Sequence, residues 1–181
     1  MSAQEQRVVS VFGSAQVVPG SPEYERVQRL GRLLAEAGCT VVTGGFGGCM
    51  EAACRGARTA GGHTVGVTLP AWGVPTNAWV CEDRPQASYI ERLVHLVARA
   101  DGYVAVDGGV GTLTELALTW SLLETHALPA RPLVALGGRW RRLLQTIADE
   151  LILRPQAMEA VQLVDTPEEV LAALQSAWLR C

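Results

Sequence analysis

Two glycine clusters in this sequence each stand between a short apolar run and an amphipathic segment. Residues 44–48 (GGFGG) follow one β-branched run, and residues 108–111 (GGVG) follow another. A third apolar run ends in Gly13-Ser14-Ala15. A buried strand that turns at glycine into a helix is typical of parallel α/β sheets. The pattern therefore predicts a sheet whose strand ends carry small residues beside helix N-termini.

The remaining segments alternate in the same way along the chain. Apolar periodicity, capping residues and glycine stops predict six strands, at 7–13, 39–43, 64–69, 102–107, 132–136 and 161–164, and helices at about 22–37, 49–60, 86–100, 112–126, 140–153 and 166–179. Residues 70–85 predict an irregular loop with room for one more short strand at 77–81. We expect one Rossmann-like α/β domain over residues 1–181. Its sheet should be mostly parallel, with six or seven strands and helices on both faces.

Composition removes several classes of function. The chain has 181 residues and no lysine, so all 15 basic residues are arginine. A P-loop and a pyridoxal enzyme both need lysine, and both are excluded. A net charge of -3 argues against a nucleic-acid partner. The three histidines and five cysteines lack metal-ligand spacing, so we expect no metal and no cofactor.

The same reading of the sequence predicts a cytoplasmic protein. No apolar run reaches the roughly 20 residues that a membrane helix needs. Residues 1–7 are polar and lack the apolar stretch of a secretion signal.

The glycine clusters suit a phosphate group. Glycine lets the backbone approach a ligand closely, and a helix N-terminus adds unpaired N–H groups and partial positive charge. The alternative is that the glycines only turn the chain. Because residues 13–15 lack a GxGxxG pattern and Thr43 replaces the acid that holds a dinucleotide ribose, a mononucleotide is favoured. The predicted phosphate- or nucleotide-binding residues are Gly13, Ser14, Gly44, Gly45, Gly108, Gly109, Gly111 and Thr112.

Residues 107–115, DGGVGTLTE, resemble the PGGxGTxxE signature of the Lonely Guy (LOG) family, whose members are often mislabelled as lysine decarboxylases. The resemblance covers nearly the whole chain. Met50 matches the methionine of the family's second glycine motif. Arg92, ten residues before Gly102, stands where the family's MHxRK motif has its arginine.

The resemblance implies a nucleoside 5′-monophosphate phosphoribohydrolase, which cleaves the N-glycosidic bond to give free base and ribose 5-phosphate. Arg92 and Glu115 would then be the catalytic residues. A carboxylate beside the ribose can stabilise the positive charge that develops there, and an arginine can clamp phosphate or ribose. The resemblance also implies a small-molecule nucleotide partner and a homodimer. Residues 112–126 are apolar nearly all round, as a helix that packs on a partner would be.

The sequence departs from the family pattern beside both motifs. Asp107 stands for the signature's proline, and Leu93 stands for the lysine that follows the arginine. Tyr89-Ile90 replace the Met-His pair, which alters the pocket for the base. Two other functions therefore stay open: a molybdenum-cofactor carrier or other nucleotide-binding protein without chemistry, and a nucleotide-sensing module for a partner protein.

Overall fold

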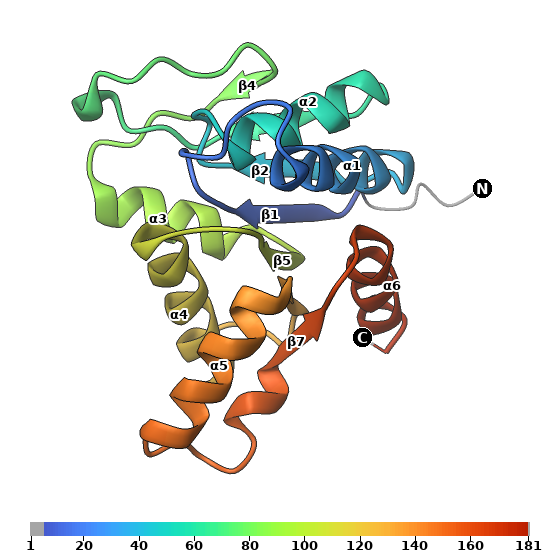
Figure 1. Cartoon of the computed structure of the whole chain (residues 1–181). Helices are drawn as coiled ribbons and strands as arrows, with labels where there is room; N and C mark the ends of the chain where they lie inside the picture. Colours follow the sequence, from blue (N-terminus) through green and yellow to red (C-terminus); the bar gives the residue numbers. More distant parts are fainter. Residues whose placement is uncertain (1–5, 181) are drawn as a thin grey trace.

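The structure is a computed structural model that describes residues 6–180. Seven strands form one sheet in the order β4-β3-β2-β1-β5-β6-β7, and every neighbouring pair is parallel (Figure 1). The strands are β1 (Val8–Phe12), β2 (Thr40–Thr43), β3 (Thr64–Gly66), β4 (Glu82–Asp83), β5 (Gly102–Ala105), β6 (Leu133–Leu136) and β7 (Val161–Val164). The predicted Rossmann-like α/β architecture is thus confirmed.

Six α-helices cover the two faces of this sheet. They are α1 (Pro22–Glu36), α2 (Cys49–Thr59), α3 (Tyr89–Ala98), α4 (Val110–Glu124), α5 (Gly138–Glu150) and α6 (Pro167–Trp178). One buried core joins the sheet to α1, α2 and α6, and a second joins its other face to α3, α4 and α5. None of the described helices is long and apolar enough to cross a membrane.

Local sequence signals set the helix starts. Ser21 caps α1 through its side chain, and Thr166 and Glu169 form a reciprocal capping box at α6. The start of α4 was predicted two residues too late, because the helix begins at Val110 with Gly109 as its N-cap. Because of this earlier start, Glu115 lies in the second turn of α4.

The extra strand was predicted at the wrong place. Residues 77–81 form a turn, in which the Val80 N–H donates to the Asn77 carbonyl, and the strand lies at Glu82–Asp83 instead. Asn77 is held by the glycine turn at 44–48 rather than by a neighbouring strand. A tertiary contact of this kind overrides the β-propensity of a short apolar segment.

Candidate functional site

A cavity of about 290 Å³ opens at the carboxyl ends of β1 and β5. The sheet order reverses between these two strands, which is the switch point where open α/β sheets bind ligands. Both proposed catalytic residues and five of the eight predicted binding residues line it. The lining comprises Gly13, Ser14, Ala15, Phe46, Met50, Trp72, Val74, Tyr89, Arg92, Gly109, Gly111, Thr112 and Glu115.

The start of α4 forms one wall of the cavity. The first-turn amides of a helix have no intrahelical acceptor, so those after Gly109 are free to meet an anion. A Cβ built at Gly109 or at Gly111 would meet no protein atom within 4 Å. The protein itself therefore does not require glycine at these two positions, whereas a ligand lying against the backbone would.

Three predicted binding glycines lie outside the cavity lining. A Cβ on Gly44 would lie 1.8 Å from Nη2 of Arg92, so this glycine makes room for the guanidinium. A Cβ on Gly108 would lie 2.2 Å from Oγ1 of Thr112. Gly45 has a φ of +79°, which favours glycine on conformational grounds. These residues shape the site without facing its interior.

Arg92 and Glu115 lie side by side within the cavity wall. Nη1 of Arg92 is 3.6 Å from Oε1 of Glu115, and their side chains are only 5% and 10% exposed. Nε of Arg92 donates to the Val67 carbonyl at 2.8 Å, which fixes the guanidinium against the end of β3. The pair therefore presents one cation and one acid to the same small volume.

Burial sets the protonation of this pair. Loss of solvent raises the pKa of Glu115 to about 7, although the nearby Arg92 charge acts in the opposite direction. Burial also lowers the pKa of Arg92, while Glu115 opposes that shift. A carboxyl group with a pKa near neutrality can serve as acid, base or charge stabiliser at physiological pH.

Aromatic side chains form a wall that sequence reasoning did not assign. The Phe46 and Trp72 rings have centroids 5.6 Å apart, and the Trp72 and Tyr89 rings 5.7 Å apart. The Arg92 guanidinium carbon lies 5.5 Å from the Phe46 ring centroid and 5.3 Å from that of Trp72. Flat rings beside a cation suit the face of a planar base. Trp72 and Trp79 in the irregular loop were the signal in the sequence that could have indicated this wall. Of the two, Trp72 lines the cavity and Trp79 does not.

Asn77 joins this irregular loop to the glycine turn. Its Nδ2 donates to the carbonyl of Gly45 at 3.1 Å and to that of Phe46 at 2.9 Å. Its backbone N–H also donates to the Gly45 carbonyl, at 2.8 Å. Asn77 is thus a positioning residue that no motif in the sequence indicated.

The acid that replaces the signature's proline is neutralised within the fold. Asp107 is buried and forms an ion pair with Arg26 of α1. Its carbonyl accepts from the Ser14 N–H at 2.9 Å, which ties the ends of β1 and β5 together. Arg26 thus offsets the charge that could weaken anion binding beside the helix start.

Other reactive side chains stand apart from this chemistry. Burial raises the pKa of Cys49 to about 12 and that of Cys54 to about 11, so both stay protonated thiols at neutral pH. Within residues 6–180, no group of three or more His, Cys, Asp or Glu could hold a metal ion. Glu51 accepts from the Tyr24 hydroxyl at 3.1 Å and lies outside the cavity lining.

Fold and site together define a Rossmann-type α/β protein with a candidate anion-binding cavity at the switch point of its sheet. The family model described as the SLOG cluster4 family matches residues 6–171. The chain belongs to that family, and the predicted resemblance to LOG proteins is confirmed.

The curated relatives include plant proteins. The probable cytokinin riboside 5'-monophosphate phosphoribohydrolase LOGL5 of Oryza sativa subsp. japonica is 32% identical over 96% of this chain and 74% of its own length. Cytokinin riboside 5'-monophosphate phosphoribohydrolase LOG3 of Arabidopsis thaliana is 28% identical over 97% of this chain and 85% of its own length.

Solved structures share the fold at lower identity. The molybdenum cofactor binding protein from Rippkaea orientalis has a TM-score of 0.78 and 23% identity, covering 96% of this chain and 98% of that one. DNA processing protein A from Helicobacter pylori, described with a single-stranded DNA binding mode, has a TM-score of 0.66 and 17% identity. It covers 94% of this chain and 80% of that one.

Proposed function

We propose that this protein hydrolyses the N-glycosidic bond of a nucleoside 5′-monophosphate and releases free base and ribose 5-phosphate. The observation that carries the proposal is the buried Arg92–Glu115 pair, in the same cavity as the open start of α4. The names of the LOG relatives support the same reaction.

Each part of the cavity has a role in this reaction. The amides that follow Gly109, with the Thr112 hydroxyl, bind the phosphate and thereby fix the sugar. Glu115 stands three residues after Thr112 on α4, and as a carboxylate it stabilises the positive charge that develops on the ribose. Arg92 orients the substrate through its remaining N–H groups, and the aromatic wall takes the base.

The alternative is a carrier or sensor that holds a phosphate-bearing ligand without chemistry. The molybdenum cofactor binding protein supports this reading through its fold alone. A carrier needs the open start of α4, but it has no use for a buried carboxyl with a pKa near 7. The enzyme is therefore the better proposal.

The deciding experiment is product analysis. Purified protein incubated with a panel of purine and modified-purine nucleoside 5′-monophosphates should release free base, detected by chromatography, with an equal amount of ribose 5-phosphate. The matching nucleosides should react far more slowly, because the phosphate supplies the binding energy that places the sugar. Calorimetric binding of the nucleotides without any release of base would establish the carrier instead.

We also propose that the protein is a homodimer that packs through α3 and α4. Ile90 and Val94 are exposed one turn apart on α3, and Val110 is exposed at the start of α4. Burying exposed apolar side chains such as these stabilises association. Light scattering at micromolar concentration should give twice the chain mass, and Val94→Glu should shift the mass to that of one chain. A monomeric wild-type protein would contradict this proposal.

A cytoplasmic location, the absence of a nucleic-acid partner and the extent of the single domain also remain predictions.

A further inference from the structure

The sheet has a second hollow, separate from the candidate active site. It has a volume of about 310 Å³ and lies over the amino-terminal parts of β1, β2 and β3. Val8 and Thr40 begin their strands, and His63 and Ala100 stand just before β3 and β5. The candidate active site lies at the opposite, carboxyl ends, and the two cavities share no lining residue.

The hollow exists because one crossover has no helix. Between β3 and β4 the chain forms only a three-residue 3₁₀ turn (Pro70–Trp72) and an irregular loop. Parallel sheets ordinarily have both faces covered by helices. Here the floor of the hollow is Val42 and Val65, flanked by Val8 and Ser10, and side chains alone close over it.

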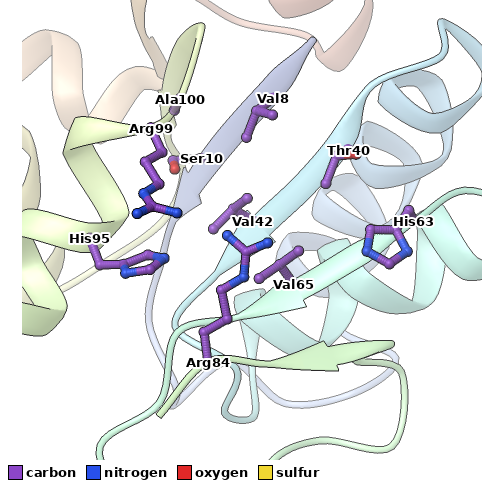
Figure 2. A pocket seen from close by; sticks show the side chains of 10 residues that line it. All are labelled: Val8, Ser10, Thr40, Val42, His63, Val65, Arg84, His95, Arg99 and Ala100. Carbon is purple, nitrogen blue, oxygen red and sulfur yellow. The ribbon is translucent and has the colours of Figure 1, made fainter. Parts of the chain in front are cut away.

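The side chains around this apolar floor are mostly basic. Figure 2 shows His95 and Arg99 extending from α3 on one side and His63 on the other, with Arg84 between them. Arg84 and His63 share one acid, Glu82, at 2.7 Å and 3.5 Å. Arg99 has no ion-pair partner in the described part of the chain. The rim thus carries an excess of positive charge.

The imidazole of His95 borders the same hollow and has an unsatisfied nitrogen. Its Nε2 is buried and has no hydrogen-bond partner among the described residues. Buried polar atoms ordinarily have a partner, and one without a partner calls for an explanation such as a bound group. The Ser10 hydroxyl is already used, since it donates to the Leu96 carbonyl at 2.6 Å.

We propose that this hollow is a second ligand-binding site, which takes a small organic carboxylate with an apolar body. The valine floor matches the apolar body, and the free guanidinium of Arg99 with Nε2 of His95 matches the carboxylate. Its volume is at the lower end of the range for small-molecule sites. A single negative charge fits better than a phosphate dianion, because Glu82 already offsets part of the positive charge.

Octanoate is a suitable probe, with 1-octanol as the uncharged control of equal chain length. Calorimetry should show octanoate binding to the wild-type protein, and 1-octanol binding at least about tenfold more weakly. Octanoate should shift the NMR signals of the His95 imidazole and of Ser10. Arg99→Ala should weaken octanoate binding about tenfold, whereas Arg142→Ala, an exposed arginine of α5, should leave it unchanged.

Absence of octanoate binding would overturn the proposal, and so would any of three further results. Octanoate and 1-octanol could bind equally well, Arg99→Ala could have no effect, or octanoate could compete with a nucleoside monophosphate and so bind at the other cavity. A protein that binds no octanoate, and whose dimer dissociates in Arg99→Ala, would show that a second copy covers the hollow. Nucleotide binding, measured separately, tests the proposed function and leaves this inference untouched.

Discussion

Glu115→Gln is expected to lower the turnover of nucleoside 5′-monophosphates by about 100-fold or more while nucleotide affinity changes little. Glutamine keeps the shape of the side chain but carries no negative charge. The glutamine side chain therefore still fills the space beside Arg92, whose Nη1 is 3.6 Å from Oε1 of Glu115 in the wild-type protein. The variant loses only the negative charge that would stabilise the developing cation. Steady-state kinetics and calorimetry on the same preparation separate these two effects.

The pH profile gives this prediction a second readout. Because burial raises the pKa of Glu115 to about 7, the ionised fraction of this carboxyl increases from pH 6 to pH 8. The kcat/KM of the wild-type protein should rise over that window by more than that of the glutamine variant. The variant should keep only the rise that comes from ionisation of the substrate phosphate, whose pKa is about 6 and which affects both proteins equally.

Glu51→Gln is the matched control for this experiment. Glu51 is likewise a helix glutamate, though only partly buried, and it is hydrogen-bonded to Tyr24 and lies outside the cavity. Its variant should retain turnover. Equal losses in the two variants, or full activity in Glu115→Gln, would remove Glu115 from the mechanism.

Gly109→Val is expected to raise the Kd for nucleoside 5′-monophosphates about 100-fold or more, with cooperative unfolding preserved. A Cβ at this position meets no protein atom within 4 Å, so we expect the fold to have room for a side chain there. The valine instead occupies the space from which a phosphate would reach the amides of α4. Loss of two charge-assisted hydrogen bonds is sufficient for an effect of this size.

Gly138→Val tests whether the effect is specific to the ligand. Gly138 also lies at the start of a helix that follows a strand, and it is not among the residues that line the cavity. Both variants place a β-branched residue in a helix start, so their stability costs should be similar. Undiminished nucleotide binding in Gly109→Val would show that the phosphate lies elsewhere.

The sequence predicted the sheet well because its strands are short apolar runs bounded by glycine. Arg92 and Glu115 could also be predicted from the sequence, since both stand in recognisable motifs. The sequence could not give the environment of Glu115. A glutamate near a helix start is ordinarily exposed to solvent and stabilised by the helix dipole, whereas the second-turn position buries this one.

The glycines show a different limit of sequence reasoning. Gly44 and Gly109 look alike in the printed sequence, each inside a glycine cluster after a strand. Gly44 avoids a clash with Arg92, while Gly109 faces open space. Only the positions of residues that are distant in the chain distinguish these two glycines. The position of Trp72 could not be predicted either, because its loop has no periodicity from which to place it.

The hydrogen bonds of Asn77 have a consequence for how this site can change. Through this one residue, the loop that supplies Trp72 is fixed to the turn that supplies Phe46 and makes room for Arg92. We therefore expect substitutions in this loop to shift the guanidinium as well. In the proposed reaction, selectivity for the base would then be coupled to reactivity, so pairs of substitutions across Asn77 should depart from additivity.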